Sequence, residues 1–152
     1  MRNRFFFGLI ASTLFWCMTA GPAFAQKKAV DYHNPAVPGP DVAAFWIDQG
    51  GLFATYGNYT AAVRAYKKAL TLNPNSHAAQ FDLGLAYAQM EDFDAALEHI
   101  NKAIELAPDQ DGYYYGRGWA LLLAGRKELA QKDIQKAAGM GNKDARAYLQ
   151  RP

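Results

Sequence analysis

The chain has 152 residues, the size of a single domain, and 51% of them are hydrophobic, which is enough to form a core. Its 16 basic and 14 acidic residues give a formal net charge of +2. Arg2 and Arg4 account for this excess, so the rest of the chain is neutral and gives no reason to expect nucleic acid or an anionic membrane as a partner. The single cysteine, Cys17, excludes a disulfide within the chain.

Residues 1–25 have the pattern of a bacterial secretory signal peptide. Its parts are a basic start (Arg2, Arg4), an apolar stretch (residues 5–20), a helix break (Gly21-Pro22) and a small-x-small cleavage site (Ala23-Phe24-Ala25). We expect cleavage between Ala25 and Gln26 and a periplasmic or secreted mature protein. An uncleaved anchor is the alternative, although a full membrane span needs about 20 apolar residues. A lipoprotein would use Cys17, but the bulky Phe15 and Trp16 precede it.

Residues 26–41 follow as a predicted extended leader, because the stretch from Asp31 to Asp41 is rich in Pro and Gly. Asp41 is placed to cap the first helix. From there to the end of the chain, residues 42–152 are predicted to form one domain.

The domain repeats itself every 34 residues. The columns in register are Gly50, Gly84 and Gly118; Ala62, Ala96 and Ala130; Ala69, Ala103 and Ala137; Phe53, Tyr87 and Leu121; and Tyr66, Ile100 and Ile134. A glycine inside a helix costs roughly 1 kcal/mol relative to alanine. Because this cost recurs in register, we expect the three glycines to mark close crossings of paired helices. A fixed period of this length indicates stacked helical units.

The pattern resembles the tetratricopeptide repeat, an antiparallel pair of helices about 34 residues long. The closest match is the first unit, with Trp46, Gly50, Phe53, Gly57, Tyr59, Ala62, Tyr66, Ala69 and Pro74. The resemblance implies an all-α solenoid of three helix pairs, at 43–76, 77–110 and 111–144. The third unit departs from the pattern, since Asn142 replaces its closing proline. A short C-terminal helix over 143–151 would cap the array.

The helix ends are also predicted. Asn58 and Asp92 are candidate N-caps of the second helices in the first two pairs, and Pro74 and Pro108 end those helices. Asn75 or Ser76, and Asp109 or Asp111, are the candidate caps of the helices that follow.

Catalysis has little support in this sequence. No thiol follows the signal, Ser76 is the one serine after it, and His33, His77 and His99 lack the spacing of metal ligands. Neither a metal nor a cofactor is expected. Asp48 and Asp82, one repeat apart, are the best pair for acid–base work, although isolated acids are usually solvated.

The resemblance implies that the first helix of each pair lines a concave groove in which ligands bind. Helical geometry places a mainly apolar set of residues there, which we take as the candidate partner-binding groove: Ile47, Asp48, Phe81, Asp82, Leu85, Tyr115, Trp119 and Leu122. We expect Phe81 and Tyr115 to form one anchor site, with Asp82 beside them to pair with a Lys or Arg of the ligand. Packing against the leader or the terminal helix is the alternative for these side chains.

A clamp for a C-terminal carboxylate, which some members of the family carry, is excluded. The matching places hold Ile47, Gly51, Asp82, Gly112 and Gly116. None is a cation, and Asp82 would repel a carboxylate.

The second repeat is acidic, with one basic residue, Lys102, against Asp82, Glu91, Asp92, Asp94, Glu98, Glu105 and Asp109. This is either a solvated outer face or a stripe that attracts a basic partner or a second copy of the chain. Together these features predict a non-enzymatic interaction module of the bacterial cell envelope, an adaptor or scaffold that binds a protein or peptide. No binding of nucleic acid, or of membrane lipid by the mature domain, is expected. The alternatives are a scaffold that self-associates and, with less support, an envelope hydrolase.

Overall fold

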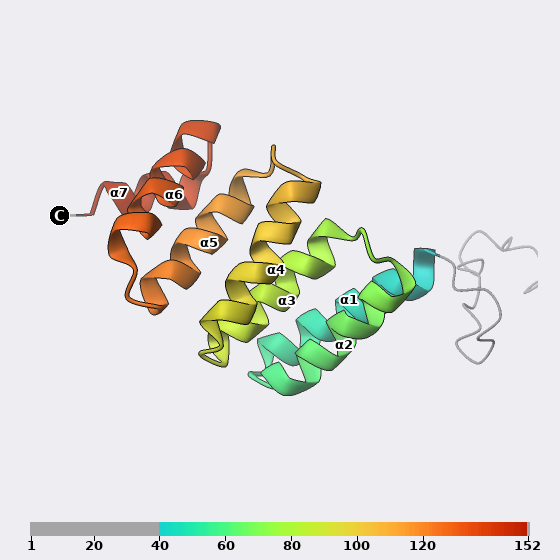
Figure 1. Ribbon diagram of the computed structural model, residues 1–152. Helices are drawn as coiled ribbons and strands as arrows, with labels where there is room; N and C mark the ends of the chain where they lie inside the picture. Colours follow the sequence, from blue (N-terminus) through green and yellow to red (C-terminus); the bar gives the residue numbers. More distant parts are fainter. Residues whose placement is uncertain (1–39, 152) are drawn as a thin grey trace, which may run out of the picture. The chain divides into compact units, whose positions relative to one another are not determined.

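The computed structural model describes residues 40–151, and the expected signal peptide and nearly all of the leader lie outside them. The described residues form seven helices without a strand (Figure 1). In chain order these are α1 (Pro40–Thr55), α2 (Tyr59–Leu72), α3 (His77–Gln89), α4 (Phe93–Leu106), α5 (Asp111–Leu123), α6 (Lys127–Met140) and α7 (Lys143–Leu149). The predicted all-α solenoid with a short final helix is confirmed.

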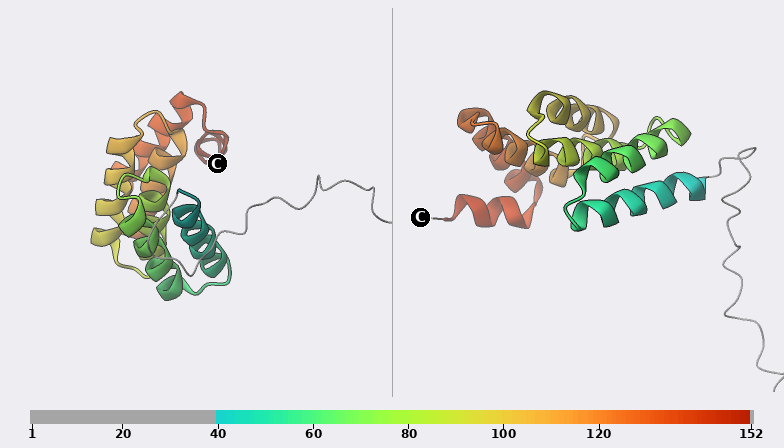
Figure 2. Two further views of the ribbon diagram at one scale, coloured as in Figure 1. Left: turned by 90° about the vertical axis from the view of Figure 1, so that its right-hand side faces the viewer. Right: turned by 90° about the horizontal axis from the view of Figure 1, so that it is seen from below.

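The helices pack as three antiparallel pairs, α1 with α2, α3 with α4 and α5 with α6, and the pairs follow one another in chain order (Figures 1 and 2). Successive pairs join through α2 with α3 and through α4 with α5, and α7 packs against α6. The first helices α1, α3 and α5 also contact one another in sequence. Their shared face is called the groove face below. None of the helices among residues 40–151 is long and apolar enough to span a membrane.

The second helices begin where the sequence predicts. The Asn58 side chain accepts a hydrogen bond from the Ala61 N–H at 3.1 Å, and Asp92 caps α4 in the same way. Ser76 caps α3 by accepting from the Ala79 N–H at 3.3 Å. Each cap satisfies a backbone N–H that the first turn of a helix leaves without a partner.

Two predicted caps are wrong. The N-cap residue of α5 is Gln110, which makes no side-chain capping bond, so neither Asp109 nor Asp111 has this role. Asp111 lies inside the first turn of α5, where its carboxylate instead accepts a hydrogen bond from Asn142. At the start of the array α1 begins at Pro40, and Asp41 therefore lies within the helix instead of capping it. Proline suits a first helical turn, because it has no N–H to leave unpaired there.

The repeated glycines mark tight crossings, as predicted. A Cβ atom on Gly84 would lie 2.6 Å from Cγ1 of Ile100 and 2.8 Å from the Ala96 carbonyl oxygen. Gly118 stands in the same relation to Ile134, at 2.8 Å. At Gly50 the place of the missing side chain is taken by the ring of Tyr66. The two helices of each pair therefore approach more closely than any side chain at these positions would permit.

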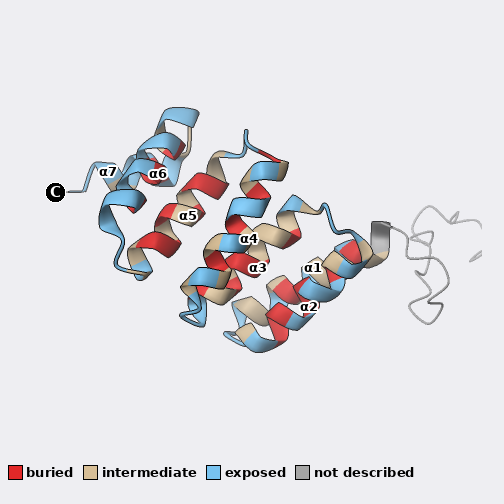
Figure 3. Ribbon diagram, in the orientation of Figure 1, coloured by how far each residue is buried: buried red, intermediate tan, exposed pale blue. Residues whose placement is uncertain are grey.

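Buried residues gather on the helix sides that face a neighbour, and exposed residues cover the outward sides (Figure 3). Leu83, Ile100 and Ile134 are the largest side chains that are fully buried. A polar link adds to this packing between α5 and α6. The Arg117 guanidinium donates to both carboxylate oxygens of Asp133, at 2.7 and 2.8 Å, and this bidentate geometry holds the two helices in register.

Candidate functional site

The candidate groove residues do not all face solvent. Phe81 fills the joint between the second and third repeats: its ring centroid lies 4.5 Å from that of Tyr113, and a Cβ atom on Gly116 would lie 2.5 Å from its ring. Tyr113 is tied in turn to the second repeat by a hydrogen bond of 2.6 Å between its hydroxyl and Nδ1 of His77. Phe81, which is half-buried, thus packs between the repeats.

The structure does not bring Phe81 and Tyr115 together as one anchor. Tyr115 and Leu122 pack against the cluster around Tyr114 and Ile134, which lies toward α7. Trp119 packs against a different cluster, around Ile100 and the buried alanines of the second and third repeats. Phe81 and Tyr115 do not form a single anchor because they stand at equivalent positions of successive repeats but pack against different neighbours. Phe81 packs against Gly116, whereas the residue one repeat after Gly116 is Gln150, which is not a glycine.

The two groove residues of α1 are placed differently from each other. Ile47 is half-buried and packs against the first core cluster, while Asp48 is exposed. Asp48 does not line the hollow that contains Asp82. The pair proposed above for acid–base work therefore does not share one site.

Asp82 and Leu85 do share a site. They line an open hollow of about 280 Å³ on the groove face, where the first repeat meets the second. Three helices contribute to its lining, which consists of Ala54 from α1, Tyr59 and Tyr66 from α2, and Asp82, Leu85, Ala86 and Gln89 from α3. We call this the Asp82 hollow. It combines one carboxylate with two tyrosines, one amide and an aliphatic floor, a composition typical of sites that bind a side chain of another molecule.

The Asp82 carboxylate has no hydrogen bond or ion pair with any residue in the described part of the chain. Burial raises its pKa from 3.8 to about 6. Its charge also reaches the tyrosines on either side. The pKa of Tyr66 is raised to about 12, mainly by burial and further by Asp82, and burial followed by Asp82 and Asp109 raises the pKa of Tyr113.

The charged Asp82 carboxylate lowers the stability of the free protein, because its charge is partly removed from water without a compensating partner. Ionisable groups whose pKa values are strongly shifted by burial are found preferentially at functional sites. The Asp82 hollow is therefore the best candidate site in residues 40–151. The described residues contain no group of three His, Cys, Asp or Glu side chains arranged to hold a metal ion.

Sequence reasoning missed the contribution of α2 to this site. Tyr66 passes between α1 and α3, with its ring against Gly50 and its hydroxyl end beside Gly51. The sequence did contain one indication that Tyr66 differs from its counterparts. The corresponding residues of the other repeats are Ile100 and Ile134, so the first repeat alone places a hydroxyl in this column.

The model of the family described as tetratricopeptide repeat matches residues 25–77, 47–111 and 81–148 in overlapping segments. A search among curated proteins found no match by sequence. Among solved structures, the first such domain of the human RPAP3 protein superposes with a TM-score of 0.68 at 24% identity, covering 74% of this chain and 90% of that one. The corresponding domain of Arabidopsis OM64 has a TM-score of 0.66 at 21% identity, with coverages of 71% and 91%.

Two further similar structures contain peptides. The first TPR of Spaghetti (RPAP3), bound to the HSP90 peptide SRMEEVD, has a TM-score of 0.67 at 23% identity and covers 74% of this chain and 90% of that one. The second TPR domain of human RPAP3, in complex with the HSP70 peptide SGPTIEEVD, has a TM-score of 0.64 at 23% identity, with coverages of 72% and 93%. At these identities the likeness establishes the fold of this chain.

Proposed function

We propose that this chain, which belongs to the tetratricopeptide repeat family, is an exported protein-interaction module that binds a peptide or protein segment on its groove face. The observation that carries the proposal is the Asp82 hollow, an open site lined by three helices, whose half-buried carboxylate has no partner in the described chain. Domains of the same fold hold short peptides in solved structures, which supports the choice of ligand class.

The ligand chemistry differs from that of those two complexes. Their peptides, SRMEEVD and SGPTIEEVD, carry acidic residues near the end. In this chain Asp82 occupies one of the places that the carboxylate clamp of the family uses, and it repels an acidic group. A basic side chain fits the same place, because it would pair with the carboxylate and lie beside Tyr59, which is half-buried at the hollow.

Site-directed crosslinking in cells tests this proposal. A photo-reactive amino acid at Gln89, which lines the hollow, is expected to capture a partner, whereas the same probe at the exposed Glu98 on α4 is not. Capture from Gln89 should disappear in a folded Asp82→Lys variant, because the reversed charge repels a basic ligand group. Equal capture from both positions, or capture that survives Asp82→Lys, would contradict a binding role for the groove face. Capture of a second copy of this chain would support the scaffold instead.

Export is part of the proposal, and it rests on residues 1–25 of the sequence. The expected result is a protein in the envelope fraction whose first residue is Gln26, because the signal is cleaved after Ala25. Intact-mass measurement of the protein purified from that fraction decides the matter. A mass that includes residues 1–25 would favour a membrane anchor, and recovery from the cytoplasm alone would exclude export.

A further inference from the structure

A second hollow occupies the equivalent place two repeats further along the array. It has a volume of about 460 Å³ and is lined by Leu122, Lys127, Gln131, Ile134, Tyr148, Leu149 and Arg151. Leu122, Lys127 and Ile134 stand two 34-residue repeats after Ala54, Tyr59 and Tyr66, which line the Asp82 hollow. The short helix α7 packs against α6 as α3 packs against α2. We call this second site the Lys127 hollow.

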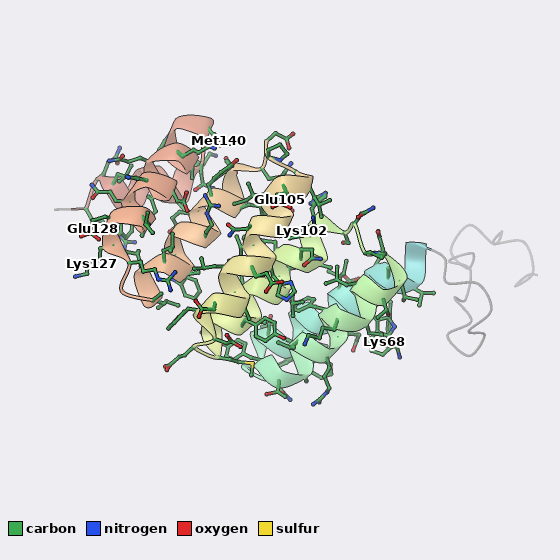
Figure 4. The ribbon with its side chains drawn as sticks, viewed as in Figure 1. Lys68, Lys102, Glu105, Lys127, Glu128 and Met140 are labelled. Carbon is green, nitrogen blue, oxygen red and sulfur yellow. The ribbon has the colours of Figure 1, made fainter. Side chains whose placement is uncertain are left out.

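The two hollows have opposite charge. No acidic residue lines the Lys127 hollow, and its cations, Lys127 and Arg151, make no ion pair within residues 40–151. Figure 4 shows the Lys127 side chain projecting outward at the start of α6. The Arg151 guanidinium lies 6.0 Å from the centre of the Tyr148 ring. In the Asp82 hollow, Tyr59 stands at the position that corresponds to Lys127, and the charge comes from the Asp82 carboxylate.

Building on the proposed function, we propose that the groove face binds an extended segment of another protein that carries a basic residue for the Asp82 hollow and an acidic residue for the Lys127 hollow. Charge complementarity at each hollow supplies the argument. A segment of this kind is bound in a single direction, because reversing it places like charges together at both ends.

The spacing of the two charges follows from the array. The two hollows are equivalent places two repeats apart, and neighbouring packed helices lie about 8–10 Å apart, so the two hollows are on the order of 20 Å apart. An extended chain covers about 3.3 Å per residue, and the basic and acidic residues of the ligand are therefore separated by about six residues. Trp119 stands one repeat after Leu85, so α5 offers a half-buried aromatic surface between the charged ends.

The inference can be tested by screening a library of short synthetic peptides against the protein purified from cells in its processed form. The wild-type protein is expected to enrich peptides with Lys or Arg about six residues from Asp or Glu. Asp82→Asn should remove only the preference for the basic residue and weaken the best peptides roughly tenfold, because the hydrogen bond between the carboxylate and the charged ligand group is lost. The double change Lys127→Gln with Arg151→Gln should remove only the acidic preference, by a severalfold and salt-dependent loss, because these cations are exposed.

The controls are Glu98→Gln and Lys132→Gln, which make the same changes of charge away from both hollows. Neither should alter the selection. An unchanged preference for basic residues in Asp82→Asn, or selected peptides without the spaced acidic residue, would overturn the inference while leaving peptide binding in place. If the folded wild-type protein enriches no peptide of any kind, the proposed function itself fails.

Discussion

Asp82→Asn is expected to stabilise the protein at neutral pH while it weakens ligand binding. Burial raises the pKa of Asp82 to about 6 from 3.8, so the charged carboxylate is less favourable in the folded state than in the unfolded chain. Each pKa unit corresponds to about 1.4 kcal/mol, and solvent at the open hollow reduces the effect, which leaves a gain of about 2 kcal/mol for the neutral amide. A gain of this size is large against the usual stability of a small domain.

The gain depends on pH in a definite direction. Above about pH 6 Asp82 is charged in both states, and its full cost is present. As the pH falls from about 6 to below 4, the folded protein takes up the proton first, and the cost disappears. Tyr66 and Tyr113, the neighbours whose titration Asp82 affects, stay protonated throughout, because their pKa values are raised from 10.

Urea unfolding of the wild type and of Asp82→Asn, at about pH 7.5 and about pH 3, measures this difference. The variant should be more stable at the higher pH and indistinguishable from the wild type at the lower one. Glu98→Gln is the matched control, since it makes the same change at an exposed position and should leave the free energy of unfolding nearly unchanged. A destabilised Asp82→Asn variant would show that the carboxylate is a structural acceptor, and the case for a binding site there would be lost.

Gly84→Leu is expected to give the largest loss of stability of any single change considered. The first carbon of the new side chain would already lie 2.6 Å from Cγ1 of Ile100 and 2.8 Å from the Ala96 carbonyl oxygen. Ile100 is fully buried and the carbonyl belongs to the backbone of α4, so neither can move without separating the two helices. Overpacking commonly costs about 1–3 kcal/mol, and this site should reach or exceed the upper end of that range.

Gly84→Ala should be destabilising as well, because the clash begins at Cβ. The matched control is Gly112→Ala in α5, where an added Cβ would meet nothing within 4 Å. That change should be neutral or slightly stabilising, since alanine is the better helix former. Thermal unfolding followed by circular dichroism compares the three variants. An unchanged melting temperature for Gly84→Leu would mean that the helices of the second repeat do not cross closely in solution.

The helix pairs could be predicted from the sequence because their causes are local or repeat at one spacing. Asn58 and Ser76 cap their helices through backbone N–H groups three residues away, so no knowledge of the tertiary structure is needed. The Gly84 column is recognisable because close crossing requires glycine at the same place in each repeat. The cap of α5 was predicted wrongly, since Asp109 and Asp111 both flank Gln110 and the exact first residue of a helix depends on small differences of geometry.

The candidate site was only partly predictable from the sequence. Periodicity placed Asp82 and Phe81 next to each other at the groove, but packing decided their roles. Phe81 is drawn into the joint between repeats because Gly116 leaves room for its ring. Asp82 remains beside an open hollow that Tyr66 of the neighbouring helix also lines, and burial there partly removes its carboxylate from water.

The amino-acid sequence by itself determined that this protein is a row of helix pairs with closely crossing helices and an acidic group at one end of its groove. The tertiary structure decided which side chains face that groove, how strongly Asp82 is desolvated and that Lys127 lines a second hollow toward the other end. The physical reason is that burial and pKa depend on contacts among three helices at once. A repeat pattern specifies which positions of neighbouring helices face each other. The side chains at those positions then determine whether the space between the helices is filled or open.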